Sequence, residues 1–343
     1  MNAFLLPREG YVRVEGALSD VMLLCDTVFQ GTVLGPPLWN SFFGDIASEV
    51  PTTSQEVNLF ADDLTGMTSV AQTTSNDILI KELEGMQQRA HRWGARDQVE
   101  FEPSKKYFKI LHPSLHVGVD FRLLGTFFDC ALTMMPGLEK LLSKIRPKIR
   151  ALLRLRTMYN EPPMLNQYKI HSWSLKEYSG GALIMTAPCQ LRRLDKVQRW
   201  FLHELGMTDT EAFTHHNFAP PSLRRSIGLL GFLHKRVIEE CHSALCEALP
   251  FCPGLQAMYH DKALDPFSDQ VRYQGRLYQR SLYIYILMYN LLPQTLVDSP
   301  FVFVFQARLT HLAKEQARRD QESWRNSYQT CAAILRMFHL RLD

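Results

Sequence analysis

The chain has 343 residues, of which 46% are hydrophobic and 21% charged, and its formal net charge is +3. These values predict one large hydrophobic core or two moderate ones, and they exclude a disordered or low-complexity chain. Seven cysteines without regular pairs, and no apolar N-terminal signal, favour an intracellular protein of the nucleus or cytoplasm over a secreted one. The longest apolar run, Leu282 to Leu292, is too short to span a bilayer and carries three tyrosines, so we expect it in a core and predict no membrane partner.

Charge is unevenly distributed along the chain. Residues 1–70 hold two basic and nine acidic side chains, whereas residues 136–206 hold thirteen basic and five acidic ones. This asymmetry favours an acidic region that collects metal ions and a basic region that binds a polyanion such as nucleic acid.

The first elements are predicted to be two strands joined by a turn, Tyr11 to Gly16 and Val21 to Val28. They lead to Gln30 and Gly31, where the glycine allows a ligand to approach the backbone closely. A helix from about Pro37 to Ala47 follows. Its expected buried face is formed by Leu38, Trp39, Phe42 and Phe43.

The stretch from Val57 to Thr68 predicts a hairpin with Asp62 and Asp63 at its tip. Neighbouring residues of a regular strand point to opposite faces, so adjacent aspartates converge only where the chain turns. Burying such a pair is unfavourable unless a cation compensates it, and a divalent metal is the usual one. For the dipeptide alone, a turn without chemistry is the more common alternative.

Downstream, Asn76 to Gly94 is predicted to be a helix. A longer helical stripe follows from Leu138, with basic residues interleaved, and Pro147 should kink or divide it. For an isolated helix, a solvated basic face explains those residues equally well. The stripe consists of Leu138, Leu141, Leu142, Ile145, Ile149, Leu152 and Leu153.

Two ordered motifs resemble the reverse transcriptases of non-LTR, LINE-like retrotransposons. In that family a QGxxLGPxLFN-type segment precedes an F/YADD hairpin, as Gln30 to Phe43 precede Phe60 to Asp63 here. Phe29 departs from the proline that usually stands before the glutamine. Further resemblance extends over nearly the whole chain. It is carried by Val99 to Ile110, by Phe121 to Thr126, which the resemblance makes a strand and turn, and by Leu194 to Phe201, Pro220 to His234, Arg280 to Leu282, Tyr289 to Pro293 and Phe305 to Leu309.

The resemblance implies an α+β fold with a partial reverse-transcriptase palm over residues 1–130. A helical thumb would follow over 131–207, and a helical C-terminal region over 208–343. It implies an RNA-directed DNA polymerase, a nucleotidyltransferase, whose partners are an RNA template, a DNA primer and deoxynucleotides.

The same resemblance implies roles for individual residues. Asp62 and Asp63 would be the catalytic ligands of Mg²⁺ or Mn²⁺. Lys105 could protonate the departing pyrophosphate, although an ordinary exposed lysine is more common on residue statistics. Gln30, Gly31, Phe60 and Ala61 would contact nucleotide or template, Leu124 and Gly125 would grip the primer, and Lys140, Lys144, Lys148 and Arg154 would contact the nucleic-acid backbone.

One departure from the family concerns a further catalytic aspartate, which members carry on a strand before the QG segment. Asp20 and Asp26 lie in the wrong place to replace it. We therefore expect a truncated enzyme that is inactive alone, needs the missing palm and fingers segment, and exposes an apolar edge that favours self-association. The alternative is a non-enzymatic nucleic-acid-binding remnant of a retroelement.

A zinc site is a further possibility that the sequence disfavours. The spacing of the candidate ligands matches neither a CCHC knuckle nor a CxxC pair, and the first two cysteines are expected on a helix as buried thiols. The candidates are Cys241, His242, Cys246, Cys252 and His260.

Overall fold

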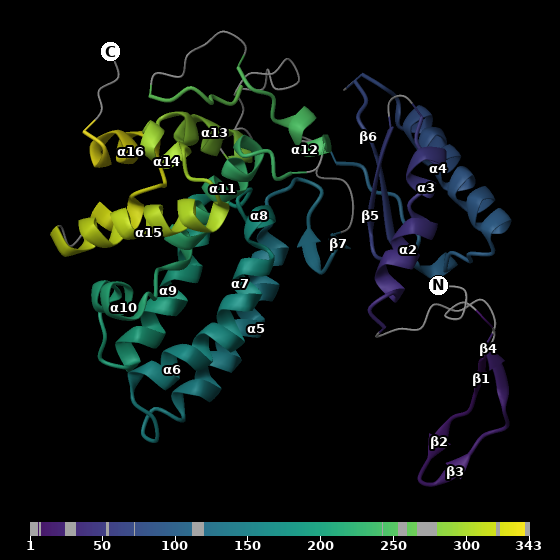
Figure 1. Cartoon of the computed structure of the whole chain (residues 1–343), viewed down its shortest axis with the longest axis horizontal. Coiled ribbons are helices and arrows are strands. Elements are labelled where there is room, and N and C mark those ends of the chain that lie inside the picture. Colours follow the sequence, from purple (N-terminus) through teal and green to yellow (C-terminus); the bar gives the residue numbers. More distant parts are fainter. Residues whose placement is uncertain are drawn as a thin grey trace. The chain divides into compact units, whose positions relative to one another are not determined.

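The computed structural model describes residues 6, 8–24, 32–52, 55–71, 73–111, 120–241, 243–252, 259–265, 280–319 and 323–339. The chain divides into two compact units, Met1–Phe108 (unit 1) and Lys109–Asp343 (unit 2). Helices and four small two-stranded antiparallel sheets make up the described parts, which is an α+β composition (Figure 1). None of the described helices is long and apolar enough to cross a membrane.

Unit 1 begins with a narrow β-ribbon, drawn in purple in Figure 1. In it, β1 (Arg8–Gly10) pairs with β4 (Met22–Leu24), and β2 (Arg13–Val14) with β3 (Ala17–Leu18). The predicted strand from Tyr11 to Gly16 is wrong in its bounds, because Glu15 and Gly16 form the connecting turn with positive φ angles. Residues 25–31, including Gln30 and Gly31, lie outside the described residues.

A small core holds the rest of unit 1 together. Helices α2 (Gly35–Phe43), α3 (Ile46–Glu49) and α4 (Asn76–Asp97) pack with the hairpin of β5 (Gln55–Phe60) and β6 (Asp63–Thr68), and η1 (Pro103–Lys105) follows. The predicted helix from Pro37 to Ala47 is two helices, and Phe42 of its expected buried face is 43% exposed. The core consists of Phe43, Ile46, Val50, Met86, Ala90 and Trp93.

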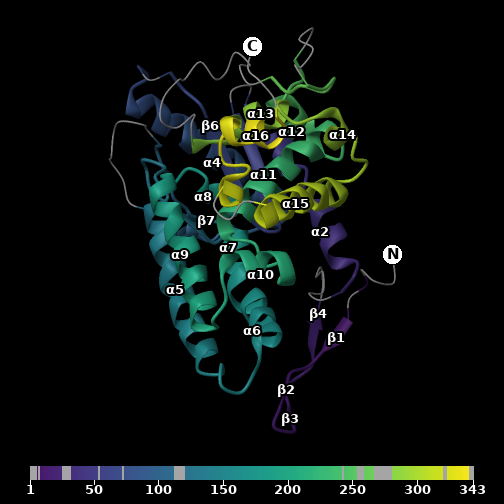
Figure 2. The same cartoon turned by 90° about the vertical axis from the view of Figure 1, so that its left-hand side faces the viewer.

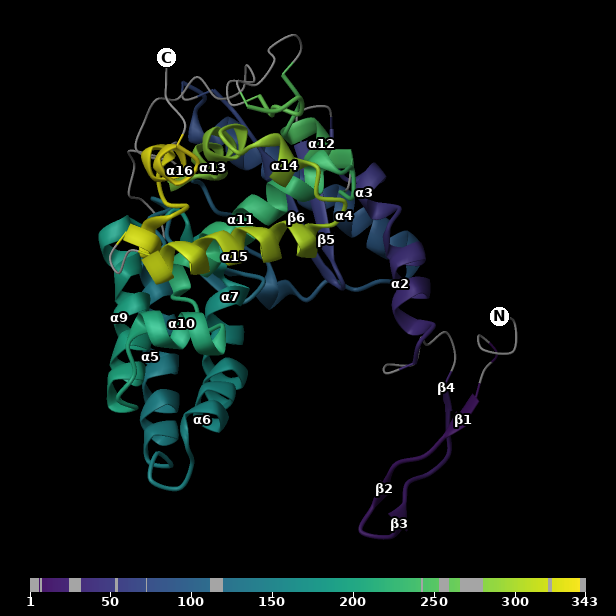
Figure 3. The ribbon, with the colours of Figure 1, turned by 60° about the vertical axis from the view of Figure 1, so that its left-hand side comes forward.

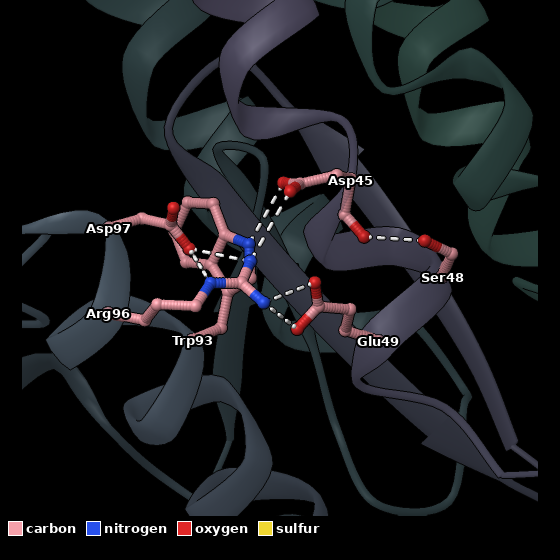
Figure 4. A network of polar contacts seen from close by, with 6 residues as sticks. All are labelled: Asp45, Ser48, Glu49, Trp93, Arg96 and Asp97. Atoms are coloured by element: carbon pink, nitrogen blue, oxygen red, sulfur yellow. Dashed lines mark hydrogen bonds and ion pairs between the residues drawn. The ribbon is translucent and has the colours of Figure 1, made fainter.

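Polar contacts join α4 to Asp45, which immediately precedes α3, and to Glu49, the last residue of α3 (Figure 4). Trp93 Nε1 donates to Asp45 Oδ1 at 2.9 Å, and Arg96 forms ion pairs with Asp45, Glu49 and Asp97. Hydrogen bonds to Asp97 and Glu49 raise the pKa of the Arg96 guanidinium. Because Arg96 is half-exposed, these ion pairs contribute little to the free energy of unfolding.

Unit 2 starts with the hairpin of β7 (Phe121–Leu123) and β8 (Thr126–Phe128), followed by α5 (Met135–Leu153). All seven residues of the predicted stripe are buried in α5, which confirms the helix. Division at Pro147 is wrong, since the buried face continues on both sides of it. The surrounding helices are α6 (Glu161–Tyr168), the π-helical turn η2 (Lys169–Trp173), α7 (Ser174–Tyr178), α8 (Gly180–Leu183), α9 (Pro188–Glu204) and α10 (Asp209–His216).

A second core in unit 2 is organised by α11 (Pro221–Val237), which packs against α13 (Leu282–Asn290) and α15 (Val302–Arg319), as Figure 3 shows for α11 and α15. The apolar run of α13 is buried here, as predicted. His234 stacks on Phe305, and its ring nitrogens lie 2.9 Å from Tyr289 Oη and 2.8 Å from the Ser299 carbonyl oxygen. The remaining elements are α12 (Ser243–Ala248), α14 (Gln294–Val297), η4 (Ser323–Asn326) and α16 (Cys331–Met337).

Candidate active site

The two aspartates lie at the tip of the β5–β6 hairpin, as the sequence predicts. Phe60 pairs with Asp63, so Ala61 and Asp62 form a two-residue loop. Exposure alternates along β5, with Val57 half-buried against the core of unit 1. This alternation fixes the register and puts the loop at the end of the ribbon. Ala61 has a φ of +54°, and glycine or asparagine is the usual residue at this conformation in two-residue hairpin loops.

Asp62 and Asp63 are both exposed. Carboxylate oxygens are the ligands that Mg²⁺ prefers, and a magnesium ion bound by one or two carboxylates keeps several waters. The described residues include no group of three histidine, cysteine, aspartate or glutamate side chains placed to hold a metal. The turn therefore offers two exposed carboxylates, with no third ligand of these types beside them in the described part of the chain.

Trp39 of α2 holds the aspartate loop in place. Its Nε1 donates a hydrogen bond to the Ala61 carbonyl oxygen at 2.9 Å, and its ring stacks on buried Phe43 at 5.1 Å between centroids. Sequence reasoning predicted Trp39 only as part of a buried face. The available signal was the residue type, because Trp39 stands where the family motif has phenylalanine, whose ring has no N–H to donate.

Two other residues predicted to act at this site, Lys105 and Phe60, are both exposed. Lys105 is exposed at the end of η1, and no contact in the described part of the chain joins it to Asp62 or Asp63. Its neighbour Lys106 lies with Nζ 2.6 Å from His91 Nε2. Phe60, beside the loop, is 62% exposed, which leaves a large apolar surface available.

The predicted primer-grip residues form the second hairpin loop. Leu124 and Gly125 connect β7 and β8, and both have positive φ angles, +45° and +81°. Two consecutive positive values are typical of a type I′ turn, which suits glycine and strains leucine. Tyr178 of α7 donates its hydroxyl to the Leu124 carbonyl oxygen at 2.6 Å. An aromatic donor from a helix therefore braces this loop as well.

The basic residues predicted to bind the nucleic-acid backbone lie on α5. Lys140, Lys144, Lys148 and Arg154 are all exposed. Lys140 lies with Nζ 3.3 Å from the Phe127 ring centroid, so a cation–π contact holds it against β8. The other three form no ion pair among the residues that the structure describes.

The candidate zinc ligands do not converge in the described parts of the chain, where no metal-binding group is found. Cys241 and Cys246 are half-buried rather than buried, with their sulfur atoms 3.1 Å apart, and only Cys246 lies on a helix. His260 is buried and hydrogen-bonds the Tyr289 carbonyl oxygen, and burial lowers its pKa. Its role here is structural, and His242 lies outside the described residues.

Comparison with known proteins gives one partial likeness. Over 108 residues the chain is 32% identical to the RNA-directed DNA polymerase from mobile element jockey of Drosophila melanogaster. The match covers 29% of this chain and 12% of that protein. No protein-family model matches the chain, and no solved structure matches it. The partial likeness supports a relationship between this chain and the reverse transcriptases of non-LTR, LINE-like retrotransposons.

Proposed function

We propose that the chain is part of an RNA-directed DNA polymerase of a non-LTR retrotransposon, with Asp62 and Asp63 as its metal-binding carboxylates. The observation that carries this proposal is the pair of adjacent, exposed aspartates on a two-residue hairpin loop that Trp39 holds from a neighbouring helix. The likeness to a jockey-element polymerase supports the same reading.

In the proposed reaction, the 3′-hydroxyl oxygen of a DNA primer attacks the α-phosphorus of a deoxynucleotide. The bond between the α-phosphorus and the bridging oxygen breaks, and pyrophosphate leaves. Bound Mg²⁺ or Mn²⁺ would stabilise the charge that develops on the phosphate oxygens. Asp62 and Asp63 would supply its protein ligands, and Lys105 would protonate the pyrophosphate.

The remaining residues would position the nucleic acid. Phe60 and Ala61 flank the aspartates and would lie against the incoming nucleotide, with Gln30 and Gly31 contacting nucleotide or template. Leu124 and Gly125 would place the primer end. The phosphates of the RNA–DNA duplex would lie along Lys140, Lys144, Lys148 and Arg154.

A two-metal site holds its ions about 3.5–4 Å apart with carboxylates from separate strands. Asp62 and Asp63 come from one turn, and no third ligand lies with them among the described residues. We therefore propose that polymerisation needs a further palm segment that supplies another carboxylate. The same observation favours the second candidate, a retroelement protein that binds nucleic acid without catalysis.

Primer extension tests the proposal. The chain alone, and the chain fused to the fingers and first palm strand of a related reverse transcriptase, would be given a primed RNA template, deoxynucleotides and Mg²⁺ or Mn²⁺. We expect extension only by the fusion, and its loss in the Asp62→Asn fusion, because that change removes a charged ligand without altering size. The fusion carrying Asp77→Asn, an exposed aspartate at the start of α4, is the matched control.

Two outcomes would decide against this reading. Extension by the unfused chain, lost in Asp62→Asn, would show that no further segment is needed. A folded fusion that binds primer-template but remains inactive would favour the non-enzymatic candidate.

A further inference from the structure

A cationic groove runs between α5 and α9 in unit 2, and Figure 2 shows the two helices side by side. One ion pair joins Glu139 of α5 to Arg193 of α9, and another joins Arg156, just after α5, to Glu204 at the end of α9, both at 2.5 Å. The first pair lies near the start of both helices and the second near the end of both, so α5 and α9 run parallel to each other. Between the two ion pairs lies a hollow of about 540 Å³ lined by Arg146, Arg150, Arg193, Lys196, Val197 and Trp200.

Three of the four basic residues that line the groove have no ion-pair partner among the described residues. Arg193 is paired, and its guanidinium lowers the pKa of the Glu139 carboxyl. Arg146, Arg150 and Lys196 are exposed and form no ion pair in the described part of the chain. Arg146 and Arg150 are one helical turn apart, a spacing at which like charges are unfavourable. An anionic ligand would relieve this repulsion.

Trp200 adds an aromatic surface among these cations. It is half-buried and packs against the core that contains Phe201, so its ring is held by the helix and still lines the hollow. Cations that track phosphates, together with an aromatic ring that stacks a base, are the two components of single-strand binding sites. Bases inside a duplex are already stacked on one another. The volume lies within the range of pockets that take small organic ligands, so it can admit a nucleotide.

We propose that the groove between α5 and α9 binds a single-stranded segment of nucleic acid. Its phosphates would lie on Arg146, Arg150 and Lys196, and one base would stack on Trp200. These residues differ from those proposed to hold the duplex. The proposal goes beyond the polymerase function and does not require catalysis.

The test measures fluorescence anisotropy of a labelled 12-nucleotide single-stranded RNA with the full chain, across a series of salt concentrations. Trp200→Leu should weaken binding by about 5- to 150-fold, the range for loss of one stacked base, without changing the salt dependence. Trp200→Phe keeps an aromatic ring and should retain most of the affinity. The pair Arg146→Gln and Lys196→Gln should lower the slope of log K against log salt by about 1.4, because single strands release about 0.7 counterions per neutralised phosphate.

Matched controls distinguish binding in the groove from non-specific attraction by positive charge elsewhere on the chain. Arg318→Gln with Arg319→Gln removes the same charge from exposed positions on α15 and should leave binding nearly unchanged. A duplex of equal length should be insensitive to Trp200→Leu. Asp62→Asn should leave single-strand binding unchanged, so failure of the polymerase proposal would not affect this result.

The proposal is wrong if Trp200→Leu binds the single strand as tightly as the unmodified chain does. It is equally wrong if the α15 control loses as much affinity as the groove pair, or if inorganic polyphosphate of equal charge competes as well as the RNA. Thermal unfolding followed by circular dichroism identifies variants that fail to fold. The comparison of Trp200→Phe with Trp200→Leu then decides the question in chains that do fold.

Discussion

Two side chains, Trp39 and Tyr178, act in the same way on two different loops. Each donates a hydrogen bond to the carbonyl of a residue with positive φ, Ala61 in one hairpin and Leu124 in the other. That conformation costs an L-residue about 1–2 kcal/mol and persists only where neighbouring structure enforces it. The loops therefore depend on helices 22 and 54 residues away from them in sequence.

Trp39→Phe is predicted to loosen the aspartate loop while keeping the ring packed on Phe43. One hydrogen bond contributes about 0.5–1.5 kcal/mol, so the free energy of unfolding should fall within that range. Mn²⁺ binding, followed by electron paramagnetic resonance, should weaken because the carboxylates are less well positioned. Phe42→Leu on the same helix is the control. Unchanged Mn²⁺ affinity in Trp39→Phe would limit Trp39 to packing.

Lys176 is a second residue with a measurable consequence. It is 3% exposed, and its Nζ donates to Tyr168 Oη at 2.5 Å. Burial, together with the positive charge of Arg224, lowers the pKa of the ammonium to about 7, although the charges of Asp195 and Glu177 oppose the shift. Near neutral pH this lysine is therefore partly deprotonated in the folded chain.

Stability is accordingly predicted to rise with pH between about 7 and 10.5. In that interval the unfolded lysine holds its proton and the folded one does not, so raising the pH favours folding by at most about 1.4 kcal/mol per unit. Urea unfolding at pH 7, 8 and 9 measures the trend. Lys176→Met has no proton to lose, and its trend should be flatter. Equal trends in the two chains would mean that Lys176 is not the group responsible.

Among elements, α4 shows how position in a helix decides the effect of a glycine. A Cβ on Gly94 would lie 2.4 Å from the Val99 carbonyl oxygen, where the chain leaves the helix through Gln98 with a φ of +58°. At Gly85 the nearest atom to a Cβ would be an Arg89 nitrogen at 3.5 Å, an ordinary contact. The close backbone contact makes glycine necessary at Gly94 and dispensable at Gly85.

Gly94→Ala is therefore predicted to destabilise unit 1 by about 1–3 kcal/mol, because backbone must move to relieve the overlap. Gly85→Ala, the matched control, should stabilise it by about 0.5–1 kcal/mol through helix propensity. Chemical unfolding followed by tryptophan fluorescence reports both changes. Equal effects in the two variants would show that the end of α4 relaxes freely.

The helices also show what the sequence could and could not predict. The stripe of α5 is fully buried because its 3.6-residue period defines one face that other helices cover. In α4 the same period includes Ile78, yet this residue is 54% exposed. Periodicity identifies a face, whereas burial depends on partners that arrive through the tertiary fold. The aspartate loop could be predicted because its pattern lies within a short stretch of sequence. The hydrogen bonds from Trp39 and Tyr178 could not, because the tertiary fold brings these side chains to the loops from distant helices.

Across the whole molecule, charge separates with the two units. Residues 1–108 hold eight basic and fifteen acidic side chains, a net charge of −7, and residues 109–343 hold thirty and twenty, a net charge of +10. The net charge of unit 2 therefore favours the long-range attraction of polyanions, and that of unit 1 favours the attraction of cations. This division matches the proposed roles of α5 and of the aspartate loop.

Replacing Lys144, Lys148 and Arg154 with alanine is predicted to weaken binding of an RNA–DNA duplex and to reduce its salt dependence. Each phosphate contact contributes about 0.9 to the slope of log K against log salt in a duplex, so the slope should fall by up to about 2.7. Anisotropy between 50 and 200 mM salt measures it. Alanine at Arg13, Lys81 and Arg92 removes equal charge from unit 1 as a control. An unchanged slope in the α5 variant would remove the thumb assignment.

The π-helical turn between α6 and α7 decides which side chain enters the core of unit 2. An α-helix turns by 100° per residue, so a residue seven positions after Tyr168 would lie on the same face as Tyr168. In an unbroken α-helix that residue would be Leu175. The π turn accommodates one more residue, so Lys176 takes that place and bonds Tyr168. The winding that puts this lysine into the core therefore also lowers the pH at which its ammonium loses a proton.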